Sequence, residues 1–449
     1  MFERTALTEL DLSHFKTPNL KAMVSMFARC SKIKKINLAG WDTSNVEYMH
    51  GLFIECYELT SIDITHFNTS KVTQLNNMFQ RCYSLTSVDI SKFDLRKVTD
   101  ISSLFSYCSR LKSIDLSNFY TDNVVLFSGL FEHCSSLTSI DISNVNLAKA
   151  NSIRNLFYNC SSLNYIITNQ LNTKSVEDMS NLFGLCSSLT SLDLSILDTS
   201  KVQRMNSMFS GCINLQYLDV SKFKTSNVQN MDWMFRDCKK LTSLDLSHFQ
   251  TPKLSSANYM FYGCENLRYL DISSFDTSQI TSMSEMFSGC VKLTSLDLSN
   301  FDTSQVGDYK YMFNNCTSLK SLNLNNFDPS WAKYFNYMFN GCESLEKLEI
   351  SDFETTRAYS MEGMFAGCKS LKELDLKTFQ TSGVNSMKEM FKGCSSLTSL
   401  DLTMFDTNKC RYFKNMFSDC NSDLVIKVSK GKASNMIEAI KNDVNVEEA

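Results

Sequence analysis

The chain contains few of the residues that interrupt a regular backbone or separate domains. Only three prolines and 14 glycines occur among its 449 residues. No Pro-rich or Gly/Ser-rich stretch divides the sequence as a linker would. Because a chain of this length exceeds what one hydrophobic core normally fills, the sequence favours one continuous repetitive body.

Strong net charge and long apolar runs are also missing. Lys and Arg number 44 against 48 Asp and Glu, a net charge of -4, and no basic cluster is present that could neutralise a phosphate backbone. No run approaches the roughly 18 apolar residues of a membrane helix, and the first residues lack the charged and then apolar regions of a secretory signal. We therefore expect no nucleic-acid partner, no membrane span and no signal peptide in this sequence.

Side chains that carry catalysis or bind metals do not cluster. The five His do not repeat in step with the 17 Cys, so a zinc-type ligand set is not predicted. One thiol, Cys134, follows Glu132 and His133, and the simpler interpretation is an exposed His beside a buried thiol. No Ser/His/Asp set, carboxylate pair or glycine-rich phosphate loop emerges. We expect no enzyme, no cofactor and no metal site.

The sequence does contain one unit of 26 residues, repeated without insertion or deletion. A Phe followed three residues later by a Cys marks each unit, from Phe27 and Cys30 to Phe417 and Cys420, sixteen times in all. So strict a period indicates identical coils stacked on one another, a solenoid. The Phe and Cys columns are predicted to be structural, and they include Phe209, Phe235, Phe261, Cys212, Cys238 and Cys264.

Within the unit, two kinds of periodicity follow one another. "KLTSLDLS" (Lys292–Ser299) alternates apolar and polar residues as a short strand does. Apolar residues then fall three or four apart, as at Val202, Met205 and Met208, which predicts a helix. The Thr of "DTS" would cap that helix, Pro252 would stand just inside its start, and the Gly that precedes Cys in six units would end it.

These residues resemble the leucine-rich repeat family, specifically its bacterial BspA-like type, whose unit is similar to "MFxxCxSLTSLDLSxFDTSxVxxM". The resemblance covers about residues 5 to 425. The predicted fold is an α/β leucine-rich repeat solenoid of about 16 repeats, with parallel strands on the concave face and short helices on the convex face. The resemblance implies a cell-surface or secreted protein that adheres to host proteins or other cells, and the absence of a signal peptide leaves a cytoplasmic location as the alternative.

The expected domains are a solenoid over residues 1–420, which begins inside a repeat, and a cap over residues 421–449. In the cap, "DLVIKV" is predicted to form a last strand and "SNMIEAIKNDV" an amphipathic helix that covers the end of the stack. Sixteen of the 17 Cys share one column, as small apolar residues. Disulfides between coils are not expected, because side chains at equivalent positions do not provide the torsion near 90° that a bridge prefers.

The outward strand position is the main candidate for function. Carboxylates about 5 Å apart repel by nearly 1 kcal/mol, so we expect donors such as Ser191, Ser195 or backbone N–H groups to offset the Asp column. The alternative is that this acidic strip attracts a basic partner or divalent cations. Tyr residues in alternate repeats complete the candidate patch, which comprises Tyr165, Tyr217, Tyr269, Asp193, Asp219, Asp245 and Asp271.

One repeat departs from the pattern. Ile167 occupies the Asp column and Thr168 an inward site. The second Phe column, after the strand, is expected to fill the core and not to form a cofactor pocket, although it is interrupted here by Val145, Leu171 and Leu197. We interpret these departures as sequence drift with a slight change of curvature.

Together these features predict a non-enzymatic module for protein recognition or adhesion. A monomer is expected to bind a protein or other macromolecular ligand, such as one on a host or cell surface, across the acidic concave face. An intracellular scaffold or effector and a passive structural spacer are the alternatives.

Overall fold

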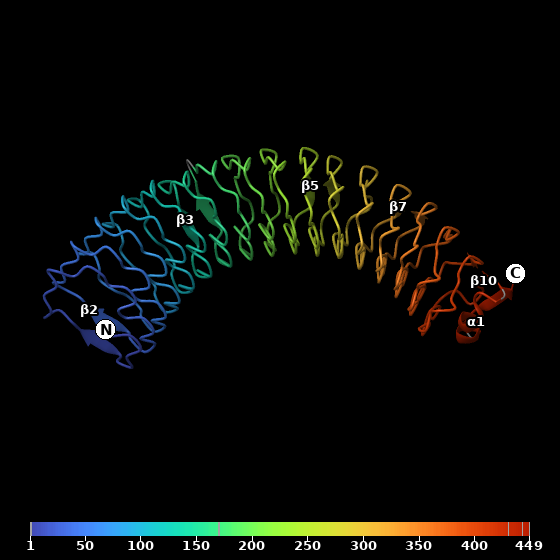
Figure 1. The fold of residues 1–449 in the computed structure, drawn as a ribbon, viewed down its shortest axis with the longest axis horizontal. Helices are drawn as coiled ribbons and strands as arrows, with labels where there is room; N and C mark the ends of the chain where they lie inside the picture. The colour runs from blue at the N-terminus through green and yellow to red at the C-terminus, as the bar shows by residue number, and fades with distance from the viewer. Residues whose placement is uncertain (1, 169–170, 430, 442, 449) are drawn as a thin grey trace. The chain divides into compact units, whose positions relative to one another are not determined.

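The structure, a computed structural model, describes residues 2–168, 171–429, 431–441 and 443–448. The chain forms two compact units, residues 1–224 and 225–449, and each is described by itself. In both units coils of 26 residues follow one another so that equivalent residues lie side by side (Figure 1). Each unit is therefore a parallel β-solenoid, the stack that the repeat predicts.

Short parallel strands occupy one side of the coils, and paired strands of neighbouring coils are offset by one repeat. The first unit contains the pairs β1 (Glu9–Asp11) with β2 (Lys35–Asn37) and β3 (Ser139–Asp141) with β4 (Tyr165–Ile167). The second contains β5 (Ser243–Asp245) with β6 (Tyr269–Asp271), β7 (Ser321–Asn323) with β8 (Lys347–Glu349), and β9 (Ser399–Leu402) with β10 (Val425–Val428), which also pairs with β11 (Asn445–Glu448).

The segment after the strand is not helical, so the expected convex-face helices are wrong. Within the described residues the single α-helix is α1 (Ser434–Ile440). Trp233 and Asp237 have φ of 56° and 55°, and the two equivalent positions have positive φ in every coil. A right-handed helix cannot contain left-handed residues every fourth position without a steric cost. Gly263, with φ of 68°, takes the left-handed conformation expected of it, but at a turn of the coil and not at a helix end.

The backbone hydrogen bonds explain why this conformation replaces a helix. In one coil the N–H groups of Met231, Trp233 and Phe235 donate to carbonyls of the next coil, each at 2.9 Å. The alternate N–H groups, such as those of Met234 and Arg236, donate three residues back within the coil, at 3.2 and 3.1 Å. This alternation satisfies both sets of donors and ties each coil to its neighbour.

The buried Thr column links coils and does not cap helices, which corrects a second expectation. The Thr251 hydroxyl accepts from the backbone N–H of Asp276 at 2.9 Å and donates to the Asp276 carbonyl at 3.0 Å, one coil on. Its own backbone carbonyl accepts from Leu254 at 3.0 Å, so Pro252 follows Thr251 inside a tight turn. Proline fits there because its fixed φ suits the second position of a turn.

The cysteines of the column are thiols and not disulfides, and all are buried apart from Cys420, which is half-buried. From Cys56 onward, the thiols of the column donate to the carbonyl of the column Phe in the preceding coil, as Cys264 does to Phe235 at 3.1 Å. Burial raises the pKa of the Cys264 thiol to about 12. The cysteines are therefore neutral hydrogen-bond donors as well as small core residues.

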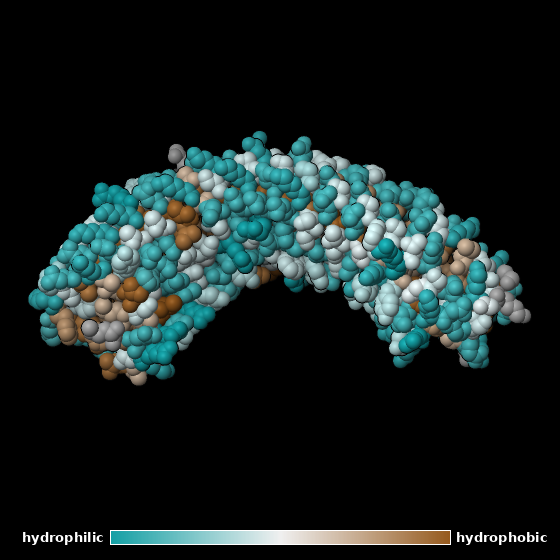
Figure 2. Space-filling model, in the orientation of Figure 1, coloured by the Kyte–Doolittle hydropathy of each residue, from teal (hydrophilic) through white to brown (hydrophobic). Residues whose placement is uncertain are grey.

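The Phe column forms a continuous aromatic stack within each unit. The rings of Phe53 and Phe79 lie 5.5 Å apart at 16° in the first unit, and those of Phe313 and Phe339 lie 5.6 Å apart at 4° in the second. Phe209, Phe235 and Phe261 are fully buried, as are Cys212, Cys238 and Cys264. Polar residues dominate the visible surface around this interior (Figure 2).

The last segment of the chain contains β10, α1 and β11. The strand β10 continues the ladder of β9, and α1 buries Met436 and Ile440. A strand and a helix are thus present where the sequence indicates them, and β11 is an additional strand. The boundary at residue 420 and the role of this segment as a cap stay predictions.

Replacing Thr251 by Val is expected to lower the free energy of unfolding by about 1–3 kcal/mol, because it removes the two hydrogen bonds that the buried Thr251 hydroxyl makes with the backbone of Asp276. Urea unfolding followed by circular dichroism measures the change. Thr294→Val, at an exposed site of the same unit, is the control and should have little effect. Equal loss in both variants would contradict the linking role.

The buried thiols predict that stability declines in alkaline solution. The pKa of Cys264 lies near 12 in the fold against a reference value of 9.0, so the unfolded chain loses its thiol proton first. The stabilisation is complete below about pH 8 and decreases as pH rises through the unfolded pKa.

Iodoacetamide labelling at pH 8 with mass spectrometry should modify Cys420 first and the buried cysteines only after denaturation. Uniform rapid labelling of the native protein would show that the column is not buried.

Candidate functional site

The Asp column ends the strand segments, with each side chain held by a local turn. The Asp193 carboxylate accepts from the Ser195 backbone N–H at 3.0 Å, and Asp245 accepts from Ser247 at 2.9 Å. The same contact, to the residue two positions on, recurs along the column at Asp11, Asp63, Asp89, Asp115, Asp141, Asp219, Asp271, Asp297, Asp375 and Asp401. These backbone N–H groups are donors of the kind expected to offset the repulsion between neighbouring carboxylates.

The turns also favour the ionised form of Asp193 and Asp245. Hydrogen bonds from the side chain and backbone of Ser195 lower the pKa of Asp193, although the charge of Asp219 on the next coil acts in the opposite direction. Ser247 lowers the pKa of Asp245 against the neighbouring charge of Asp271 in the same way. The column therefore presents negative charge to solvent at neutral pH while it stabilises the turn.

The three candidate tyrosines are all exposed at the same position of their coils, which is where β4 and β6 begin. In the first unit Tyr165 opens β4 and is 61% exposed, and Tyr217, two coils further on, is 62% exposed. In the second unit Tyr269 opens β6, is 54% exposed, and donates from its hydroxyl to Asp271 at 3.2 Å. The structure thus places Tyr165, Tyr217, Asp193 and Asp219 on the strand side of the first unit, and Tyr269, Asp245 and Asp271 on that of the second.

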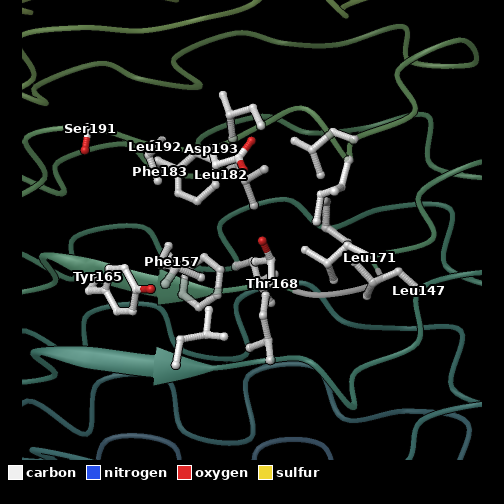
Figure 3. A pocket seen from close by; sticks show the side chains of 18 of the residues that line it. Leu147, Phe157, Tyr165, Thr168, Leu171, Leu182, Phe183, Ser191, Leu192 and Asp193 are labelled. Atoms are coloured by element: carbon white, nitrogen blue, oxygen red, sulfur yellow. The ribbon is translucent and has the colours of Figure 1, made fainter.

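A cavity of about 310 Å³ opens in the first unit at the irregular repeat. We call it the leucine cavity. It lies between the coil of β4 and the coil that follows (Figure 3). Its lining includes Leu147, Phe157, Leu171, Leu182, Phe183 and Leu197, with Tyr165, Thr168, Ser191 and Asp193 among its polar members.

The expectation that the second Phe column fills the core is wrong at this place. Leu171 and Leu197, which line the cavity, stand where most coils carry a Phe, and Val145 takes that position one coil earlier. Shorter side chains in successive coils leave volume that a repetitive backbone cannot collapse to fill. The signal was visible in the sequence as three consecutive departures in one column, but periodicity alone does not distinguish a cavity from repacking.

The Glu132–Cys134 stretch does not assemble a reactive thiol. The His133 ring stacks on Tyr107 with centroids 4.0 Å apart and bonds through Nδ1 to Asn159. Cys134 instead donates its thiol to the Phe105 carbonyl at 3.2 Å, and burial raises its pKa. This geometry is that of a side chain on the surface beside a core thiol.

Among the residues that the structure describes, no group of three or more His, Cys, Asp or Glu side chains is placed to hold a metal ion. No helix in the described ranges has the length and apolar character needed to cross a bilayer.

Several solved structures are similar to this chain. The chain is similar to a leucine-rich cell surface protein of Faecalibacterium prausnitzii, at 18% identity over 76% of this chain and 87% of that one, with a TM-score of 0.40. It is also similar to a leucine-rich repeat protein of Eubacterium ventriosum, at 15% identity over 81% and 83%, with a TM-score of 0.40. A third similar structure is a domain of InlJ from Listeria monocytogenes, described as including a cysteine ladder, at 16% identity over 98% and 73%, with a TM-score of 0.20.

These descriptions name bacterial leucine-rich repeat proteins but not the BspA-like type. No protein of curated function matches the chain. The family model described as "Mycoplasma protein of unknown function, DUF285" matches residues 1–88, 73–191, 166–270, 258–372 and 344–442. Because these matches together span nearly the whole sequence, the chain belongs to the DUF285 family.

Proposed function

We propose that the chain is a non-enzymatic recognition module that binds a protein or other macromolecular partner through its strand side. The observation that carries this proposal is the exposure of Tyr165 and Tyr217 in the same unit as Asp219 and Asp193, whose pKa is lowered by Ser195. Tyrosine supplies a large amphipathic contact area at a low entropic cost, and it is enriched at the energetic centres of interfaces.

The backbone supports this surface in a way that suits recognition. Strand positions are fixed by coils that bond to their neighbours, so the exposed side chains need little ordering on binding. The Asp column adds negative charge, which favours a partner with a basic surface and makes association sensitive to salt. We therefore propose an extended basic partner as the ligand.

We also propose that the protein works at the cell surface or after secretion, on the basis of the resemblance of its repeat. Protease added to intact cells should then digest the chain, whereas the cytoplasmic alternative predicts protection until the cells are lysed. A known cytoplasmic protein serves as the control, and it must stay intact in the same sample. Full protection of the chain alongside that control would exclude the surface location.

Replacement of Tyr165, Tyr217 and Tyr269 by Ser is expected to weaken partner binding at least about 30-fold, since tyrosines at an interface centre each contribute up to a few kcal/mol. The partner is first captured from host or cell-surface extract on the immobilised chain, and its Kd is then measured by biolayer interferometry. Tyr359→Ser with Tyr412→Ser is the matched control, because both residues are exposed but lie outside the strand positions.

Unchanged affinity in the triple variant would remove the strand side as the binding surface. Capture of no partner that competes with excess soluble chain would favour the passive spacer instead.

A further inference from the structure

We propose that the leucine cavity binds a small amphiphile with an apolar chain and a cationic amine head. This ligand is separate from the macromolecular partner proposed above. The cavity interior would receive the chain, and the polar rim at Asp193 would receive the head.

The cavity has an identifiable structural origin. In regular coils the second aromatic column fills the space behind the strand, as Phe249 and Phe275 do with ring centroids 6.1 Å apart. At the cavity this position is held by Leu171 and Leu197, each smaller than Phe. Thr168 also replaces the aliphatic residue of the inward strand site, and its hydroxyl is directed into the gap (Figure 3).

The ring spacing of the main Phe stack is slightly larger beside the cavity. The centroid distances from Phe131 to Phe157, Phe157 to Phe183 and Phe183 to Phe209 are 6.0, 6.0 and 5.9 Å. Earlier in the same unit, the stacked rings from Phe27 to Phe131 are 5.5–5.7 Å apart. The wider spacing thus coincides with the coils that line the cavity.

Solvent can reach this interior. Phe183 is 6% exposed, whereas Phe27, Phe53, Phe79 and Phe105 of the same column are fully buried. Four other apolar lining residues are half-buried: Ile166, Ile167, Leu171 and Leu192. The apolar lining is therefore accessible from the strand side, and a ligand that covers it would remove apolar surface from water.

The size and lining define the apolar part of the ligand. A volume of about 310 Å³ falls at the lower end of the range of small-molecule sites, roughly 300–1,000 Å³. Leu, Ile and Phe residues form most of the lining, and polar groups share its exposed surface, so the cavity offers both an apolar wall and polar contacts. A single alkyl chain of medium length fits these dimensions better than a two-chain lipid.

The rim defines the head group. Asp193 lines the cavity, and the Ser195 hydrogen bonds that lower its pKa keep it ionised. One of its oxygens accepts from Ser195, and a carboxylate can accept further hydrogen bonds. The described lining contains no Lys or Arg, while Tyr165 and Ser191 add hydroxyl groups. An amine is thus favoured over a fatty carboxylate, which Asp193 would repel.

Isothermal titration of the full chain with decylamine, decanol and decanoate at neutral pH tests the proposal. The wild type should bind decylamine most tightly, decanol at least several-fold more weakly, and decanoate most weakly. L171F with L197F restores the aromatic residues of regular coils and should lose at least tenfold in decylamine affinity, with Tm unchanged or raised. D193N should abolish the preference for the amine over the alcohol and retain binding of the alcohol.

The outcomes are separable from those of the proposed function. Y217S, outside the cavity, should retain decylamine binding even if it loses the macromolecular partner. If the double variant fails to fold, T168L, which restores an aliphatic residue at the inward site, replaces it and should weaken binding in the same direction. Failure of the wild type to bind any of the three probes, or equal decylamine affinity in a folded cavity-filled variant, would overturn the proposal.

Discussion

The hydrogen bonds between successive coils are the constraint on which the rest of the structure depends. In each coil alternate backbone N–H groups leave the coil and donate to the next one, as those of Met231 and Phe235 do. The residues between them can then only bond three positions back, and this requires left-handed conformations at Trp233 and Asp237. A coil of this kind has no stable conformation on its own, because half of its donors need a neighbour.

The same constraint accounts for the invariant spacing of the side-chain columns. Thr251 bonds both backbone groups of one residue in the following coil, and Cys264 donates to a carbonyl in the preceding coil. An insertion within a coil would move both groups away from their partners and leave buried polar atoms unsatisfied. Strict repetition of 26 residues is thus a requirement of hydrogen bonding, to which aromatic stacking of the Phe column adds favourable contact.

The departures from the pattern at Leu171 and Leu197 reduce the side-chain volume of the second Phe column, where these residues replace aromatic ones. Backbone bonds still join these coils at the main Phe column, where the N–H of Phe157 donates to Leu182 at 3.1 Å and that of Phe183 to Met208 at 2.9 Å. The Cys186 thiol still donates to the Phe157 carbonyl at 3.1 Å beside the cavity. Side-chain volume can therefore be lost from one column at a modest cost in folding free energy. The resulting space can become a ligand site in a solenoid.

The sequence by itself determined the solenoid, its repeat length, the buried Phe and Cys columns and the outward Asp and Tyr positions. These follow from a period that any stack of equal coils must show. It could not determine the conformation after the strand. Val202, Met205 and Met208 face inward at spacings of three residues, which a helix and a chain of linked turns share. Only the bonds between coils, which lie outside any single repeat, decide between the two.

The candidate site divides in the same way. That Tyr165 and Asp193 share a face could be read from the repeat, but that both line one cavity could not. Whether smaller side chains leave a space depends on how far neighbouring coils can close over it, and here the backbone ladder prevents closure. Tertiary packing alone decided that these substitutions produce a cavity, because the hydrogen-bonded spacing of the coils is set by all their neighbours together.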